Sequence, residues 1–471
     1  MHSVLVIVFL FGTVFSTNSS TNIEVSTPEG TIVGNSNTYN DSPLHEFLGI
    51  PFAEPPIGDL RFRKTRPLTL RPETLFAQTM PPACPQYVQY DYPWYDNKPF
   101  ISEDCLYLNI WVPGYRTQEK KAVMFWIHGG GFTYGSNRLD IFNGRILATE
   151  NDVIVVSPNF RLGALGFLSS DSKLAPGNMG LYDILEALKW VKNNIEYFGG
   201  NSKKVTIFGE SSGINAEELV RALNSLNPTN IQNFNFITGD ELVPLNPKST
   251  LLSGNVNNVS VFLGFDQDEG SLNLIFSDTN YFGGFGEKNP FFNKTVGSGF
   301  ILDGLKKFVC FTDVVRHYLG HVNEYDYQEV REQTYHALGD FFKTCPVIYF
   351  GDSFAKAGRD VYFYYFNHRP AVSQFAYWMG VYHFSQVQFT FGRPLADKEG
   401  YTGEEIDLSR YMMTLWTNFA KYGKPTNYIE KSTPLRRNYI YIGTNEWKSS
   451  YLQNHEENCE FYKTYFDQQE Q

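Results

Sequence analysis

Residues 205–213 read Val-Thr-Ile-Phe-Gly-Glu-Ser-Ser-Gly, and this stretch decides the fold. Its first four residues are β-branched or aromatic, which predicts a strand, and a helix-like stretch follows the last glycine. A Gly-x-Ser-x-Gly motif between a strand and a helix is typical of a nucleophile elbow, a sharp turn that exposes the serine hydroxyl. We therefore expect Ser211 to act as a nucleophile at the end of a strand.

A second glycine-rich loop supports this interpretation. The sequence His-Gly-Gly-Gly-Phe at 128–132 follows the apolar run 122–127, which predicts another strand. Such a loop lends backbone NH groups to an oxyanion hole. We expect the NH groups of Gly130, Gly131 and Ser212 to stabilise the oxyanion, each by about 3 kcal/mol. Glycine at the first two positions permits close approach of the backbone to the substrate.

The rest of the chain predicts one α/β domain over residues 17–471. No linker, repeat or low-complexity block divides the 471 residues. The first part reads as short antiparallel strands and turns that form one flank. From residue 122 onward, apolar strands alternate with helices, which indicates a central, mostly parallel sheet covered by helices on both faces. We expect strands at 122–127, 153–157, 205–208, 259–265 and 361–366. We expect helices at 145–151, 181–197 and 408–422, and a further helical stretch near 313–338.

The N-terminus predicts a secreted, extracellular product. Residues 1–16 combine an apolar run at 4–15 with a small Ser16 that suits signal-peptidase cleavage, and twelve apolar residues are too few to span a bilayer. The polar ending at 465–471 offers neither a transmembrane stop nor a lipid-anchor tail. We therefore expect no membrane span, and we expect glycosylation at the surface sequons. These sequons are Asn40, Asn258 and Asn293, with Asn18 close to the cleavage point.

Charge and cysteine content narrow the function further. A net charge of -11 argues against nucleic acid as a partner and would draw a cationic substrate toward an acidic cleft, although simple solubility explains it equally. Five cysteines in an oxidising compartment predict two disulfides and one remaining thiol. Spacing alone leaves fifteen ways of choosing the pairs.

A nucleophilic serine needs a base, and the base needs an orienting acid. His383 lies in a glycine-containing loop after the strand 361–366, which is where a base is expected. Glu269 follows the strand 259–265, at a strand end from which a carboxylate can reach the cleft. Asp266 and Asp268 are alternatives to Glu269 on chemistry alone. The other histidines lie in the leader, the tail, the glycine loop or within or before predicted elements: His2, His45, His128, His317, His321, His336, His368 and His455.

Two further features allow alternative interpretations. Glu210, next to the nucleophile, either favours a cationic substrate and organises water or is only a surface charge. His317 and His321 are four residues apart on an expected helix and could share a metal, but no carboxylate lies beside them, which favours a surface role. We expect neither a metal nor a cofactor.

The chain resembles the type-B carboxylesterase and cholinesterase family over nearly all of its mature length. The resemblance implies an α/β-hydrolase fold, hydrolysis of small-molecule carboxylic esters, and a triad of Ser211, Glu269 and His383, which decides among the three carboxylates. It also implies disulfides Cys84–Cys105 and Cys345–Cys459, with Cys310 as the remaining thiol. The matching blocks are 47–62, 102–109, 128–132, 159–163, 178–200, 209–213, 268–271 and 378–395.

Within the family, the runs 84–88, 378–381 and 415–421 are most similar to acetylcholinesterases. Trp94 lies close to where cholinesterases keep a tryptophan that binds choline by a cation–π contact, although a tryptophan in a short disulfide loop also serves packing. The loop between Cys84 and Cys105 is shorter than in those relatives. Gln89 and Leu272 also replace an aspartate and an aromatic residue that are usual there. The resemblance implies choline esters as the substrate class.

The chain departs from the family directly after Gly213, where a helix and a central strand are missing. Two arrangements are possible. The helix-like 215–226 could replace the lost crossover and pair the strand 259–265 with 205–208, which would displace Glu269 by about 4.8 Å. Alternatively, the sheet keeps the family layout and leaves unpaired strand edges. The expected function is a secreted serine esterase, and the alternative is a catalytically impaired isoform or a non-catalytic adhesion or binding protein of the same fold.

Overall fold

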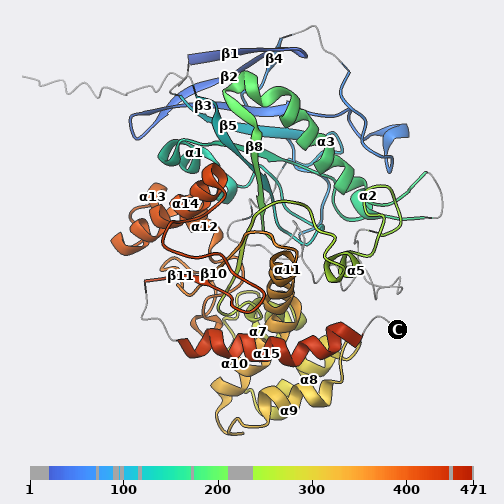
Figure 1. Ribbon diagram of the computed structural model, residues 1–471, viewed down its shortest axis with the longest axis vertical. Coiled ribbons are helices and arrows are strands. Elements are labelled where there is room, and N and C mark those ends of the chain that lie inside the picture. Colours follow the sequence, from blue (N-terminus) through green and yellow to red (C-terminus); the bar gives the residue numbers. More distant parts are fainter. Residues whose placement is uncertain are drawn as a thin grey trace, which may run out of the picture.

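The computed structural model describes residues 21–69, 74–88, 95, 100–114, 119–170, 174–210, 237–444 and 449–468 (Figure 1). Its strands are β1 (Thr21–Thr27), β2 (Gly30–Tyr39), β3 (Ser42–Pro51), β4 (Leu75–Phe76), β5 (Tyr107–Pro113), β6 (Lys121–Ile127), β7 (Ile154–Pro158), β8 (Gly200–Gly209), β9 (Val261–Asp266), β10 (Val361–Phe366) and β11 (Tyr439–Ile442). Its α-helices are α1 (Arg145–Asn151), α2 (Gly163–Phe167), α3 (Met179–Asn194), α5 (Pro247–Leu252), α6 (Ser271–Ser277), α7 (Thr279–Phe282), α8 (Lys294–Leu305), α9 (Phe311–Leu319), α10 (Tyr327–Gly339), α11 (Cys345–Lys356), α12 (Val387–Thr390), α13 (Arg393–Ala396), α14 (Gly403–Tyr422) and α15 (Ser449–Gln468). Shorter helical turns are η1 (Gly58–Leu60), η2 (Asp140–Phe142), η3 (Ile195–Phe198), η4 (Asp340–Thr344) and η5 (Tyr377–Met379).

The larger sheet has the strand order β1-β2-β3-β5-β7-β6-β8, with β4 beside β2. Neighbours are antiparallel from β1 to β7 and parallel through β7, β6 and β8. Every residue of β6 is buried, as the apolar run at 122–127 predicts for a central strand. Val123 and Phe125 pack toward Ala187 of α3, whereas Met124 packs on the other face with α1 and with Met413 of α14. Helices therefore cover both faces, and the expected α/β-hydrolase architecture is confirmed.

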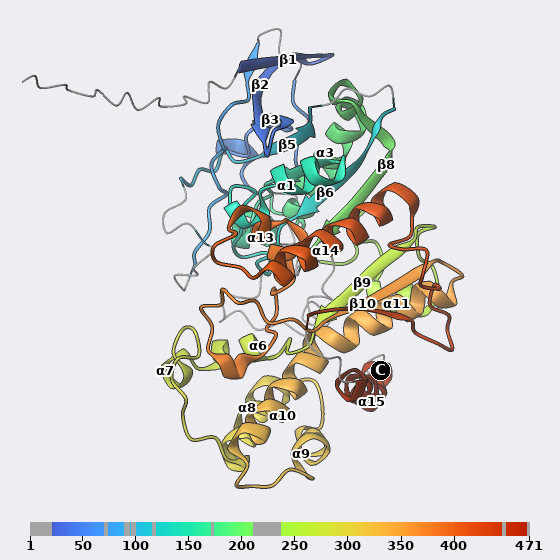
Figure 2. The same cartoon turned by 90° about the vertical axis from the view of Figure 1, so that its left-hand side faces the viewer.

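The smaller sheet has the order β11-β10-β9, and all its pairs are parallel. Phe363 and Tyr365 of β10 face a core built with α10, α11 and α15, whereas Tyr364 and Phe366 face α14. The alternation of these four residues follows the two-residue period of a strand. In Figure 2, this sheet lies next to α11, below the larger sheet.

One helix packs against both sheets. α14 starts with a capping box between Thr402 and Glu405, which satisfies free backbone NH groups at its N-terminus. Its Trp416 contacts Phe262 of β9 and Tyr364 of β10, with ring centroids 4.9 Å away in each case. Met413, one turn earlier, belongs to the core beneath β6. In Figure 2, α14 lies between β8 of the larger sheet and β9 of the smaller sheet.

The sheet is divided where the sequence lacks a segment. In the described part of the chain, β8 pairs with β6 and β9 pairs with β10, but β8 and β9 do not pair with each other. The alternative in which the strand around 259–265 moves next to 205–208 is therefore wrong for these residues, and the arrangement is the one with separated strand edges. Ile207 of β8 is 53% exposed, which is unusual for a strand of its apolar character. The expected helix 215–226 lies outside the described residues.

Candidate active site

The glycine loop and the end of β8 lie side by side. In the parallel pair of β6 and β8, Ile127 is the partner of Gly209. The loop that begins at His128 therefore starts beside the turn that begins at Glu210. Ser211 and Ser212 follow that turn directly, but both lie outside the described residues.

Glycine is required in this loop by its backbone conformation. Gly130 and Gly131 have φ values of 115° and 56°. A Cβ atom on Gly130 would lie 2.0 Å from the carbonyl oxygen of Tyr134, and one on Gly129 would lie 2.2 Å from Oε2 of Glu210. Substitution would therefore displace the loop. The loop is also held by His128, whose ring stacks on Phe160 at 4.4 Å.

His128 is excluded as a base by its surroundings. Burial lowers its pKa to about 4, so that the ring is neutral and remains a packing group at ordinary pH. Its Nδ1 lies 2.9 Å from the carbonyl oxygen of Gly129.

His383 lies in the loop that follows β10, and three acidic residues of the β9 turn hold this loop. The NH of Val381 donates to Oδ2 of Asp268 at 2.7 Å, and the NH of Ser385 donates to Oδ2 of Asp266 at 3.1 Å. Oε2 of Glu269 lies 2.6 Å from Nδ1 of His383. Glu269 is thus the carboxylate that contacts the imidazole, whereas Asp266 and Asp268 bind the backbone on either side of it.

The carboxyl group of Asp266 is buried beside two other acidic side chains. Burial, together with the charges of Glu269 and Glu210, raises the pKa of Asp266 well above its ordinary value. Oε1 of Glu269 accepts a hydrogen bond from the NH of Asp266 at 2.9 Å, which fixes the orientation of its carboxylate. Arg369, which the sequence did not single out, donates to the carbonyl oxygen of Gly380 at 2.6 Å and supports the same loop.

Glu210 lies on the opposite side of His383 from Glu269. Its Oε1 is 2.7 Å from Nε2 of His383, and its side chain is only 8% exposed. The interpretation of Glu210 as a surface charge is therefore wrong. Burial and the charge of Lys343 oppose protonation of His383, but Glu210 and Glu269 outweigh both and raise the pKa of His383 to about 9. No local sequence signal reports this contact, because it joins the end of β8 to a loop far along the chain.

The predicted disulfides are both present, whereas the predicted choline-binding residue lies outside the described part. Cys84 is bonded to Cys105, and Cys345 to Cys459, while Cys310 is a free, exposed thiol. Trp94 is among the residues that are not described. Of the sequons, Asn40 and Asn258 are exposed, whereas Asn293 is half-buried and its side chain caps α8 through the NH of Val296.

The expected histidine pair does not share a helix. α9 ends at Leu319, so that His321 lies in the following turn and is exposed. His317 stacks on Phe461 at 4.2 Å, and its Nε2 lies 2.8 Å from Oδ1 of Asn458. These contacts give His317 a packing role.

Comparisons with known proteins agree with this architecture. The sequence model of the carboxylesterase family matches residues 19–215 and 213–470. The break between the two matched stretches falls where the sheet is divided. No helix among the described residues is long and apolar enough to cross a membrane.

Several characterised proteins are similar over most of their length. Acetylcholinesterase-1 of Trittame loki is 33% identical over 538 aligned residues, covering 94% of each chain. Acetylcholinesterase of Bungarus fasciatus is 36% identical over 90% of this chain and 83% of its own, and cholinesterase of Mus musculus is 30% identical over 94% and 86%. The first alignment is longer than this chain of 471 residues, so the relative carries segments that this chain lacks. The chain belongs to the carboxylesterase family, and this family membership indicates carboxylic ester hydrolysis.

Proposed function

We propose that the protein is a secreted serine esterase that hydrolyses carboxylic esters through an acyl-enzyme on Ser211. One observation carries the proposal. Glu269 contacts Nδ1 of His383 at 2.6 Å, and Nε2 of the same ring faces Glu210, the residue that precedes Ser211. Glu269 and His383 make the acid–base contact that acyl transfer requires, and Glu210, on the other side of the ring, directly precedes the proposed nucleophile in the sequence.

In the proposed mechanism, His383 accepts the proton of Ser211 through Nε2 as the serine oxygen attacks the ester carbonyl. Glu269 stabilises the imidazolium that forms, and the NH groups of Gly130, Gly131 and Ser212 bind the oxyanion. His383 then gives the proton to the leaving alcohol, and water releases the acid by the same steps in reverse order. Because Glu210 is in contact with Nε2, its carboxylate must move aside for the serine proton to reach that atom.

We propose choline esters as the substrate class. The similar proteins of Trittame loki and Bungarus fasciatus carry the name acetylcholinesterase. The net charge of -11 and the buried carboxylate of Glu210 favour a cationic substrate, and Trp94 is the candidate for a cation–π contact.

We also propose that residues 1–16 direct secretion and are removed, and that 17–471 form one domain. Two disulfides support an oxidising compartment. Asn40, Asn258 and Asn293 are the proposed glycan sites. Nδ2 of Asn293 can carry a glycan while its Oδ1 caps α8.

The test is ester hydrolysis by the purified, secreted chain. We expect kcat/KM for acetylthiocholine to exceed that for phenyl acetate by about tenfold, a difference that one cation–π contact can supply. Ser211→Ala should abolish hydrolysis of both esters. Hydrolysis that survives in the variant would show that the serine is not the nucleophile. Equal rates for the two esters in the native chain would remove the choline part of the proposal.

A second candidate is a catalytically impaired isoform or a non-catalytic adhesion or binding protein of the same fold. It is favoured by Glu210, whose carboxylate contacts the nitrogen that must receive the serine proton, and by the division of the sheet. A monodisperse, folded product that hydrolyses neither ester would support this candidate.

A further inference from the structure

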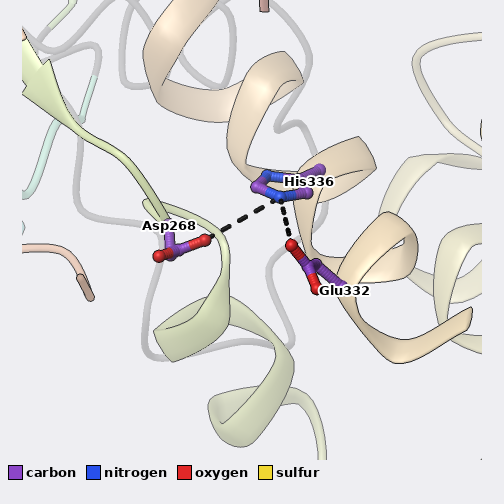
Figure 3. Close-up of side chains that lie close together, drawn as sticks. All are labelled: Asp268, Glu332 and His336. Atoms are coloured by element: carbon purple, nitrogen blue, oxygen red, sulfur yellow. Dashed lines mark ion pairs between the residues drawn. The ribbon is translucent and has the colours of Figure 1, made fainter. Parts of the chain in front are cut away.

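A cluster outside the triad brings together Asp268, Glu332 and His336 (Figure 3). Glu332 and His336 lie one turn apart on α10, and Asp268 reaches them from the turn after β9. Nε2 of His336 is 3.8 Å from Oδ1 of Asp268 and also 3.8 Å from Oε1 of Glu332. Figure 3 shows the imidazole nitrogen facing both carboxylates.

Both contacts of His336 are ion pairs rather than hydrogen bonds. Hydrogen bonds between nitrogen and oxygen span about 2.7–3.2 Å, so that 3.8 Å is too long. A tetrahedral metal ion with bonds of about 2.1 Å holds two ligand atoms about 3.4 Å apart, so that the side chains would close by about 0.4 Å around a bound ion. Asp268 and His336 are only 2% and 7% exposed, and a cation would offset the cost of burying the carboxylate.

Neighbouring groups already orient the ligands. Tyr335 donates its hydroxyl to Oδ1 of Asp268 at 3.1 Å, and the NH of Val381 binds the other oxygen at 2.7 Å. Such outer contacts fix carboxylates in metal sites. One imidazole and two carboxylates suit Zn²⁺, which accepts nitrogen and oxygen ligands, whereas Ca²⁺ and Mg²⁺ prefer oxygen alone.

Of the three residues of the cluster, His336 borders a pocket, whereas Asp268 and Glu332 do not line it. His336 lines a pocket of about 330 Å³ whose wall also includes His317, His321 and His455. His455 is engaged by Asp340 and by the carbonyl oxygen of Gln267, and His317 by Asn458. His336 is therefore the imidazole of this pocket that also faces two carboxylates.

We propose that Asp268, Glu332 and His336 bind a divalent transition-metal ion of the Zn²⁺ class. The site differs from the pair His317 and His321 that the sequence suggested, and it includes none of the three residues of the proposed triad. Asp268 precedes Glu269 and binds the backbone of Val381, two residues before His383. A bound ion would tie α10 to the loop that carries the base.

The test is calorimetric titration of ZnCl₂ into the full secreted chain, prepared without a histidine tag and stripped with a chelator. We expect one Zn²⁺ per chain. Glu332→Gln and His336→Gln should each weaken binding by about 100-fold. His321→Gln, at an exposed histidine of the same pocket, is the matched control and should bind as the native chain does.

Two results would overturn the proposal: no Zn²⁺ binding by the native chain, or native affinity in both ligand variants. CaCl₂ and MgCl₂ serve as comparison titrations and should bind far more weakly than ZnCl₂. The Glu332 side chain is 22% exposed, so that Glu332→Gln keeps the fold and decides the outcome if His336→Gln is not secreted. Because no ester is used, the result does not depend on the proposed esterase function.

Discussion

The two sheets differ in how completely each builds its part of the candidate active site. The smaller sheet carries the proposed acid Glu269 and the proposed base His383, which contact each other at 2.6 Å, and Asp266 and Asp268 bind the backbone of the loop that holds His383. The larger sheet carries the glycine loop and the turn before Ser211, but β8 ends as an edge strand with an exposed Ile207. The acid–base pair therefore depends on one sheet alone, whereas its approach to the nucleophile depends on contacts between the sheets.

The largest effect is expected inside the smaller sheet. Glu269→Gln should lower kcat for ester hydrolysis by about 10⁴-fold, because the neutral amide no longer stabilises the imidazolium of His383. Asp266→Asn is the matched comparison, since Asp266 binds the NH of Ser385 rather than the imidazole. Steady-state kinetics should show a much smaller loss for Asp266→Asn. Equal losses in the two variants would mean that Glu269 has no special role.

The next largest effect is expected from the disulfide between two helices, α11 and α15, that pack in the core of the smaller sheet. The Cys345–Cys459 disulfide joins α11 to α15 and closes a loop of 114 residues. The double variant Cys345→Ser, Cys459→Ser should lose about 2–5 kcal/mol of unfolding free energy, measured by denaturant titration. Cys310→Ser, at an exposed free thiol, is the control and should unfold as the native chain does. An unchanged midpoint for the double variant would contradict the expectation.

A substitution in α14 should weaken the packing between the larger and the smaller sheet. Trp416→Ala removes contacts with Phe262 and Tyr364 and should cost about 3 kcal/mol of stability. Activity should fall together with stability, since α14 packs against both sheets. Tyr411→Ala, at a residue of the same helix that is 46% exposed, should change neither. An equal loss of stability in both variants would show that the effect comes from changing α14 itself and not from losing the contacts of Trp416 with Phe262 and Tyr364.

The smallest expected effect is a change in pH dependence at the contact between the halves. Activity requires neutral His383, whose pKa of about 9 places the rise of kcat/KM at alkaline pH. Glu210→Gln removes one of the two carboxylates that raise this pKa, so that the rise should move to lower pH. A pH profile that does not move would show that Glu210 does not control the protonation of His383.

The contact between Glu210 and His383 also predicts how the free energy of unfolding changes with pH. The folded pKa of His383 lies above its ordinary 6.5, so the protonated ring stabilises the fold fully below pH 6.5. This contribution should be lost as the pH rises toward 9. In Glu210→Gln the loss should be smaller. Denaturant titrations between pH 6 and pH 10 measure both chains.

The elements that end at the candidate site are predictable from the sequence, because each has a strong local pattern. The apolar run of β6, the glycine loop and the loop of His383 all lie where their sequences predict. Whether β8 and β9 pair with each other is not predictable from the sequence. Strand pairing across a missing segment depends on contacts between distant residues, such as that of Trp416 with Phe262. The burial of Glu210 and the cluster around His336 were missed for the same reason. Both join residues that are distant in sequence.

We propose that the divided sheet still brings Ser211 to the pair of Glu269 and His383. Intact-mass measurement after treatment with a fluorophosphonate probe tests it directly, because the probe reacts only with an activated serine. We expect one adduct per native chain, none on Ser211→Ala, and labelling at least about 100-fold slower on Glu269→Gln. A folded, secreted native chain that takes up no probe would show that Ser211, Glu269 and His383 do not form a working triad.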